Sequence, residues 1–508
     1  MGKEVHKKLN IVYLWRIITV FFVLLVAARL FYCLGYEGIS DDDEAWHVNN
    51  AYEMFKTNSW LVNTFNWEAD YYNSKPPLGL WPTIVAFKIF GTSLFSMKIG
   101  SALCAFLLFI LLCFHVIKNY GYRAAAFCAA HFLILDYCFD YHNFRTGNLD
   151  AAFCLIFTVS VISIINFCKS ENKLLFYNAF FFMGLAFLTK GTHFLTILAV
   201  IIIAAPFWFK KTGITDILMA IIISVIAPFI WFIKRYRYDG TAFFDALRSE
   251  TSSKAGFTVS SVYLKMLFED RTFIAFVIIL VVFLVIHLIG KYISKNRNSE
   301  TKITEKKFWT YIINMDAGLY IAWVWMIVPI LFFSISGTEH AWYIYPSYIA
   351  MSYLTGFYAD RLLEKPLLKG VCYFVCGMFL IYSAFSGITK TMDYVNSGSG
   401  GNIARNYGYD IESASLNYPE YAGANAYIQN VSRTDESVEL TQWHNDLVAY
   451  SRIIMDLNCL DGGVEGFLND ESAILILNKS LWDKYSDQLY GYVILQDNEY
   501  LIFCNEKY

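Results

Sequence analysis

Long uninterrupted apolar runs constrain the fold of this chain more than any other feature of its sequence. WRIITVFFVLLVAARLFYCL begins at Trp15, and RTFIAFVIILVVFLVIHLI begins at Arg271. Either run is long enough to cross about 30 Å of hydrocarbon as an α-helix. Of the 508 residues, 57% are hydrophobic and 16% are charged, whereas soluble globular proteins carry about 25% charged residues. The sequence therefore predicts a mainly α-helical, polytopic membrane protein, and it carries no nucleic-acid-binding motif.

About eleven segments are predicted to span the membrane. The loops KEVHKK, KNYGYR and FKKTG are basic and all fall on one side under this count, which places them in the cytoplasm by the positive-inside rule. The first apolar run exceeds a signal-peptide core and is predicted to be retained. PPLGLWPTIVAFKIFG is short and is interpreted as an interfacial helix. The predicted spans lie near residues 14–34, 97–117, 123–140, 149–168, 174–189, 193–209, 214–233, 272–290, 310–333, 341–358 and 368–387.

Two domains are predicted, a transmembrane domain over 1–390 with a first outer loop at 35–96, and an extracytoplasmic α/β domain over 391–508. SGSGGN at 397–402 is typical of a linker. ESAILILNK predicts a strand, YVILQDNEYLIF predicts a hairpin, and SLWDKYSDQL between them predicts a helix. Cys459 and Cys504 lie in this domain, and the sequence alone leaves open whether they form a disulfide.

Four consecutive carboxylates, Asp41 to Glu44, follow the first span. A carboxylate at the centre of a bilayer helix costs roughly 2.5–3.5 kcal/mol on insertion scales. The cluster must therefore lie outside the hydrocarbon or in a wet cavity. It is either a solvated loop or a set of side chains positioned for chemistry.

Other polar residues occur at the same, outer ends of the predicted spans. Cations there run against the positive-inside bias, so an anionic partner is expected to hold some of them, and phosphate fits their charge and geometry. These outer residues are Lys75, Arg145, Asp150, Lys190, His193, Glu339, His340 and Tyr343, together with Lys234, Arg235, Arg237, Arg248, Lys254, Lys265 and Arg271 of a predicted loop at 234–271.

A carboxylate beside phosphate-binding cations is sufficient for one kind of group transfer. If a sugar is joined to a membrane lipid through phosphate, an attacking hydroxyl needs a base, which Asp or Glu can supply. The leaving phosphate needs cations that stabilise its charge. Hydrolytic glycosidases instead need two paired carboxylates.

The order of the motifs resembles that found in the GT-C membrane glycosyltransferases of the protein O-mannosyltransferase and aminoarabinose (lipid A) transferase superfamily. The match covers roughly residues 10–360. The motifs, in order, are Asp43-Glu44 in DDDEAWHVNNAYEM, KPPL at 75–78, IFGTSLFSMKIGSAL, Arg145 and Asp150 in FRTGNLD, LTKG at 188–191, and FFSISGTEHAWYIYP at 332–346.

This resemblance implies an inverting transfer of a sugar from a polyprenyl-phosphate donor to a cell-envelope acceptor, which is a glycan, lipid or protein, on the outer face of a bacterial cell membrane. It implies that Asp43 is the base or an acceptor-positioning group, with Glu44 and Asp150 as further catalytic carboxylates. Lys75 and Tyr343 are expected at the donor phosphate. Arg145, Lys190 and Arg271 are further candidates for phosphate binding, since they are cations on the outer side.

Three departures from the aminoarabinose branch stand out. Trp46 and His47 occupy the places of an Arg-Tyr pair, and Glu339 replaces a lysine. Ser74 replaces the acidic residue before KPP, so that branch's metal site is not carried over. No cofactor is predicted, and a divalent metal is compatible with the chemistry but not required. Aminoarabinose and lipid A are not predicted as the substrates.

Two other functions are compatible with part of the pattern. A flippase or transporter of lipid-linked sugars should place its ionisable residues near the membrane midplane, whereas here they concentrate at outer ends. A glycan ligase or polymerase would share this location but use a pyrophosphate-linked donor, and only motif order favours the monophosphate.

Overall fold

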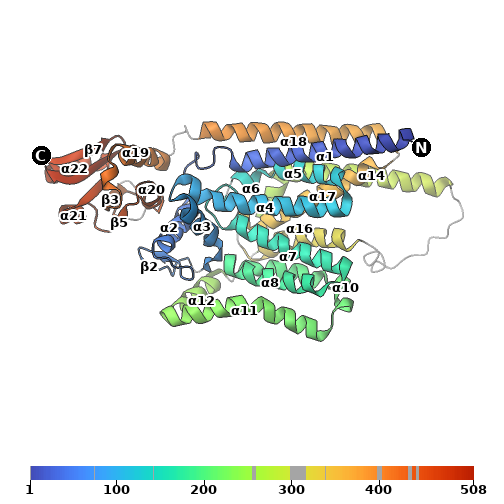
Figure 1. Cartoon of the computed structure of the whole chain (residues 1–508), viewed down its shortest axis with the longest axis horizontal. Coiled ribbons are helices and arrows are strands. Elements are labelled where there is room, and N and C mark those ends of the chain that lie inside the picture. Colours follow the sequence, from blue (N-terminus) through green and yellow to red (C-terminus); the bar gives the residue numbers. More distant parts are fainter. Residues whose placement is uncertain are drawn as a thin grey trace.

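Two structural units make up the chain, a helical bundle and a small sheet-containing unit at one end of it (Figure 1). The N-terminus lies at the opposite end of the bundle (Figure 1). The structure is a computed structural model that describes residues 2–507, apart from 74, 141, 255–258, 298–315, 338, 366, 398–402, 433–437 and 442–444. The predicted linker at 397–402 therefore falls almost entirely outside the described residues.

Eight helical stretches in the described part of the chain are long and apolar enough to cross a membrane. This confirms the predicted mainly helical, multi-pass membrane protein. One stretch joins two helices, α8 and α9, across a short 3-10 turn at Gly191–His193. The helices concerned are α1 (Gly2–Phe31), α4 (Leu94–Tyr120), α7 (Asp150–Ser170), α8 (Lys173–Lys190), α9 (Phe194–Ile203), α11 (Ile214–Asp239), α14 (Arg271–Arg297), α16 (Ala317–Ile335) and α18 (Lys369–Ser397).

The other predicted spans are helical but shorter or less apolar. They correspond to α5 (Tyr122–Leu133) with α6 (Asp136–Asp140), to α9 with α10 (Ala205–Trp208), and to α17 (Tyr345–Leu363). Nearly all of α5 and α17 is buried among other helices. Gly356 allows α5 and α17 to pack closely because it has no side chain. A Cβ at this position would lie 2.7 Å from the carbonyl oxygen of Ala124. A helix that faces protein instead of lipid needs less hydrophobicity. This explains why eight stretches qualify as membrane spans by length and hydropathy, whereas about eleven spans were predicted.

The described residues of segment 234–271 are mainly helical, which corrects the prediction of a long loop. Helix α11 continues to Asp239 and is followed by α12 (Ala242–Lys254) and α13 (Val262–Glu269). Helix α11 packs against the loop at 35–96, since the Trp231 indole donates a hydrogen bond of 2.9 Å to the carbonyl of Leu61. Within segment 234–271, the Arg235 guanidinium lies 5.8 Å from the centre of the Tyr71 ring of the same loop. That loop contains β1 (Thr64–Phe65), β2 (Glu68–Ala69), the 3-10 turn η1 (Pro77–Leu80) and the short apolar helix α3 (Trp81–Phe90).

A mixed sheet forms the core of the C-terminal unit. The predicted strand is β6 (Ala473–Asn478), the predicted hairpin is β7 (Tyr492–Asp497) with β8 (Tyr500–Lys507), and the predicted helix is α22 (Trp482–Leu489). The sheet order is β4-β3-β6-β8-β7, and β5 also pairs with β3. Six further elements were not predicted from the sequence, namely β3 (Asn425–Val431), β4 (Glu439–Leu440), β5 (Asn458–Leu460), α19 (Ile403–Asn417), α20 (Asn445–Met455) and α21 (Gly463–Leu468).

Both faces of this sheet are covered by helices. Ile474 and Ile476 pack in one cluster with α19 and α20, whereas Leu475 and Leu477 pack on the other face with α21 and α22, as the two-residue period of a strand requires. Cys459 and Cys504 are both buried free thiols. The disulfide that the sequence left open is therefore not formed.

The C-terminal unit packs directly on helix α2 (Asp42–Lys56), which follows the first span. Arg452 of α20 lies 2.9 Å from the carboxylate of Glu53, and both side chains are fully buried. Its guanidinium also donates to Asn49 at 3.1 Å, and the Tyr52 hydroxyl donates to Asp456 at 2.7 Å. Helix α2 is thus held between the bundle and the C-terminal unit.

Candidate active site

The four acidic residues at the start of α2 have different environments. Asp41 caps the helix, accepting a hydrogen bond of 2.7 Å from the backbone amide of Glu44. Asp42 is exposed in the first turn, where the helix dipole favours a negative charge. Asp43 lines a cavity and its side chain is 55% exposed. Glu44 is fully buried on the opposite side of the turn. The helical geometry therefore directs one carboxylate of the four into the cavity.

Glu44 fixes the position of α2 against the bundle. Its carboxylate lies 3.2 Å from the ammonium of Lys98, and both side chains are fully buried. It also accepts hydrogen bonds from the backbone amides of Ser40 at 2.6 Å and Gly147 at 2.7 Å. Gly147 permits this approach because a Cβ there would lie 2.9 Å from Val48. A catalytic role for Glu44 does not fit this position, since its oxygens already have partners and do not reach the cavity.

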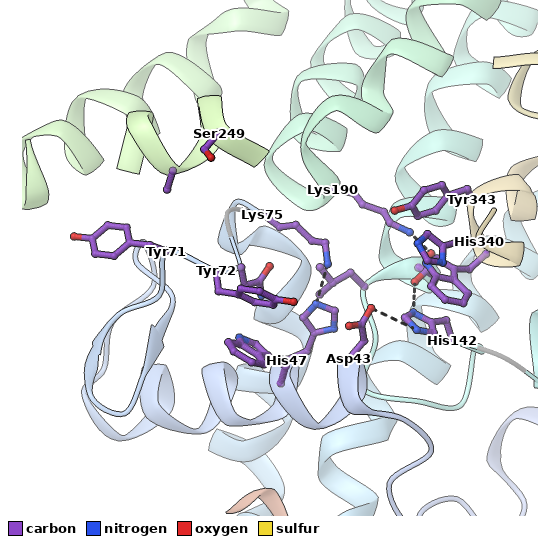
Figure 2. A pocket seen from close by; sticks show the side chains of 16 residues that line it. Asp43, His47, Tyr71, Tyr72, Lys75, His142, Lys190, Ser249, His340 and Tyr343 are labelled. Atoms are coloured by element: carbon purple, nitrogen blue, oxygen red, sulfur yellow. Dashed lines mark hydrogen bonds and ion pairs between the residues drawn. The ribbon is translucent and has the colours of Figure 1, made fainter. Parts of the chain in front are cut away.

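A cavity of about 540 Å³ brings together residues from five separate helices and from the loops between them. Asp43 and His47 come from α2, Lys75 precedes η1, and Asp150 begins α7. Lys190 ends α8, Ala246 and Ser249 lie on α12, and Trp342 and Tyr343 belong to the 3-10 turn η4 (Ala341–Ile344). Figure 2 shows Asp43, Lys75, Lys190 and Tyr343 around this space. Five predicted site residues, namely Asp43, Lys75, Asp150, Lys190 and Tyr343, are thus brought together.

The turn KPPL holds Lys75 at the cavity wall. The Asn63 amide donates to the carbonyls of Asn73 at 3.0 Å and Lys75 at 2.9 Å, and Pro77 begins η1, a position where proline costs no backbone hydrogen bond. The Lys75 ammonium lies 3.4 Å from Nε2 of His47, whose Nδ1 lies 3.0 Å from the Asn148 side-chain oxygen. A neutral His47 that donates from Nδ1 can accept from Lys75, so His47 orients the lysine.

The environment of His47 favours this neutral form. Burial lowers the pKa of His47 to about 3, and the nearby charge of Lys75 acts in the same direction. An unfolded histidine has a pKa of about 6.5, so the unfolded chain binds an extra proton between these two values. The stability associated with neutral His47 is present above about pH 6.5 and is lost as the pH falls toward 3.

We expect the His47→Gln variant to lose less thermal stability than the wild type between pH 7 and pH 4.5. Glutamine has no proton to bind in this range, whereas all other titrating groups are shared by the two proteins. The measurement is the difference in apparent Tm between the two pH values, taken for both proteins in the same detergent. An equal loss in both would contradict a neutral, buried His47.

Asp150 and Lys190 form a buried ion pair at the far wall of the cavity. The Lys190 ammonium donates to the Asp150 carboxylate, and both side chains are 4% exposed. The same ammonium lies 5.0 Å from the centre of the Tyr343 ring. Close approach of the KPPL and LTKG turns depends on Gly79, where a Cβ would meet the carbonyl oxygen of Thr189 at 3.1 Å. The pair joins α7 to α8 and places one cation and one phenol at the cavity.

His142 also lines this cavity, and the sequence analysis did not select it. Its Nε2 lies 3.6 Å from both Asp41 and Asp43, and its Nδ1 lies 3.6 Å from Asp150. The imidazole stacks on Trp342, with ring centres 3.6 Å apart and an interplanar angle of 5°. The available signal was its place in FDYHNFRTGNLD, a turn that already held two predicted site residues.

Aromatic side chains form the side of the cavity near α12. Trp46 stacks on Phe65 at 4.5 Å and packs against Tyr72 at 4.8 Å, and its indole donates to Asp70 at 2.6 Å. Tyr71 and Tyr72 also line the cavity and are exposed. The sequence analysis noted Trp46 and His47 only as departures from the aminoarabinose branch, and it gave neither a role.

Two predicted phosphate-binding arginines lie elsewhere. The guanidinium of Arg145 is fully buried, donating to the carbonyls of Arg29 at 2.7 Å and Tyr32 at 3.0 Å and pairing with Glu37 at 3.1 Å. It therefore fastens the end of α1 to the turn before α7 and cannot reach a ligand in the cavity. Arg271 is exposed at the start of α14 and does not line the cavity. Phosphate binding by these two residues is not supported by their positions.

Comparisons with known proteins agree with this architecture. Residues 74–232 match the family described as Dolichyl-phosphate-mannose-protein mannosyltransferase. The structure resembles that of ArnT from Cupriavidus metallidurans bound to undecaprenyl phosphate, with a TM-score of 0.67, 16% identity and coverage of 96% of this chain and 98% of that chain. Over part of its length the chain is therefore similar to proteins of the protein O-mannosyltransferase and aminoarabinose transferase superfamily.

Curated proteins also match part of the chain. An undecaprenyl phosphate-alpha-4-amino-4-deoxy-L-arabinose arabinosyl transferase of Shewanella sediminis is 25% identical over 223 residues, 42% of this chain and 39% of that protein. A second transferase of the same description, from Pseudomonas fluorescens, is 28% identical over 236 residues, 44% of this chain and 39% of that protein. The chain thus aligns with about two fifths of the length of these relatives.

Proposed function

We propose that the chain transfers a sugar from a polyprenyl-phosphate donor to a cell-envelope acceptor on the outer face of the membrane, with inversion at the anomeric carbon. The observation that carries this proposal is the meeting of Asp43 with Lys75 and Lys190 in one cavity. Two curated relatives are described as undecaprenyl phosphate-alpha-4-amino-4-deoxy-L-arabinose arabinosyl transferases, which supports a donor of this class.

Each step has a group of suitable chemistry in the cavity. Asp43 takes the proton of the acceptor hydroxyl as its oxygen attacks the anomeric carbon. The bond between that carbon and the phosphate oxygen breaks, and its electron pair leaves with the polyprenyl phosphate. Lys75 binds the leaving phosphate and stabilises its charge, with Tyr343 as a second contact. The Asp150–Lys190 pair shapes the sugar site. No step in this scheme needs a metal.

The proposal is tested by incubating the purified chain with a panel of undecaprenyl-phosphate sugars and a cell-envelope extract as acceptor. We expect one monophosphate donor to release undecaprenyl phosphate, detected by mass spectrometry, and the sugar to appear on the acceptor. Release from pyrophosphate-linked donors alone would indicate a ligase or polymerase. Movement of an intact donor across a vesicle membrane without bond cleavage would indicate a flippase.

Replacing Lys75 should weaken donor use in this assay. A hydrogen bond to a charged group contributes about 1.5–3 kcal/mol, so Lys75→Met should lower kcat/KM for the donor roughly 10- to 150-fold. The matched control is Lys88→Met, because Lys88 is an exposed lysine of α3 whose ammonium bonds Asn58 outside the cavity. Equal activity of the two variants would contradict phosphate binding by Lys75.

A further inference from the structure

His142 occupies the centre of the charged groups in the cavity. Its two ring nitrogens face different elements, with Asp41 and Asp43 of α2 on one side and Asp150 of α7 on the other, each at 3.6 Å. Figure 2 shows the imidazole directed toward Asp43, next to His340. His142 is therefore a direct structural connection between the proposed base and the Asp150–Lys190 pair.

The surroundings of the ring restrict it to this orientation. Trp342 stacks face to face on the imidazole with ring centres 3.6 Å apart, and His340 also stacks on Trp342, with ring centres 4.6 Å apart. The side chain of His142 is 8% exposed. Its backbone has φ of 38°, a left-handed value that is costly for residues other than glycine and is often found at functional sites. The chain thus accepts local strain to hold this imidazole between the carboxylates.

We propose that His142 is a positioning residue that sets the direction of the Asp43 carboxylate toward the acceptor hydroxyl. This inference rests on the proposed transfer reaction. Nε2 lies within ion-pair range of the Asp43 carboxylate, at 3.6 Å, and leaves the second oxygen of that carboxylate for the proton of the acceptor. Asp150, held by Lys190, faces the other ring nitrogen at the same distance. Without this ring, the Asp43 side chain, which is 55% exposed, can turn into solvent.

The test compares His142→Ala and His142→Gln with the wild type in the donor-release assay. A misplacement of about 1 Å in a reacting group can cost about 100-fold, so we expect His142→Ala to lower kcat about 10- to 100-fold. The KM for the donor should change less than about threefold, because Lys75 is untouched. Gln retains an N–H at a similar reach and should recover most of the lost kcat.

The same assay distinguishes failure of the proposed transfer reaction from failure of the role proposed for His142. If the wild type releases no polyprenyl phosphate from any donor, the proposed function fails and this inference fails with it. If the wild type is active and His142→Ala keeps its kcat within about twofold, only the inference is overturned. The inference is also overturned if both His142 variants lose apparent Tm together with kcat and if His142→Gln recovers neither. That result would assign His142 a structural role.

Discussion

Replacing Asp43 with asparagine is expected to lower kcat for sugar transfer by about 10²- to 10⁴-fold, the usual contribution of a positioned general base. Asparagine keeps the size and polarity of the side chain but cannot take the acceptor proton. The KM for the donor should change little, since the donor phosphate is assigned to Lys75. The measurement is the steady-state rate of undecaprenyl phosphate release at saturating donor and acceptor.

Asp42→Asn is the matched control for this variant. Asp42 is the neighbouring acid in the same helical turn, but it is exposed and does not line the cavity. It should retain full activity. Equal losses in the two variants would mean that the negative charge of the turn matters and that the position of Asp43 does not.

Replacing Glu44 with glutamine is expected to destabilise the protein by about 3–5 kcal/mol, the usual cost of breaking a buried ion pair. The Lys98 ammonium would remain buried without its charged partner. The measurement is the apparent Tm in detergent, followed by donor affinity at a temperature where the variant is folded. The exposed Glu68→Gln is the control and should shift stability by less than about 0.5 kcal/mol.

A double variant separates the ion pair from the other contacts of Glu44. Lys98→Met removes the orphaned charge, so Glu44→Gln with Lys98→Met should recover part of the stability lost by Glu44→Gln alone. Recovery should be incomplete, because Glu44 also accepts hydrogen bonds from two backbone amides. A Glu44→Gln protein with wild-type Tm and no activity would restore the catalytic role that the sequence suggested.

The bundle and part of the site could be predicted from the sequence because membrane physics leaves few alternatives. Long apolar runs must be helices, and a carboxylate cluster after the first span must lie in water. Asp43, Lys75, Asp150, Lys190 and Tyr343 were predicted to lie on one side of the membrane from the order of the apolar runs, and all five line the cavity. The choice of Asp43 among the four acids and the roles of Lys75 and Tyr343 came from the resemblance to the GT-C glycosyltransferases.

What the sequence could not supply was the direction of each side chain. Glu44 and Arg145 are as polar as Asp43 and Lys75, but they face buried partners, and only tertiary structure reveals the carbonyls and the Lys98 ammonium that hold them. Segment 234–271 looked like a loop because its charges obscured the helical pattern, whereas its described residues are mainly helical and Arg235 packs against Tyr71 of the loop at 35–96. The role proposed for His142 depends on its distances to residues of α2 and α7, which only the tertiary structure supplies.

The most direct test of the central claim is an experimental structure of this chain with undecaprenyl phosphate. The account predicts that the phosphate lies in the 540 Å³ cavity, within a hydrogen-bond distance of about 3 Å from the Lys75 ammonium and on the same side as Asp43. A phosphate bound outside this cavity, with Asp43 and Lys75 both remote from it, would contradict the account.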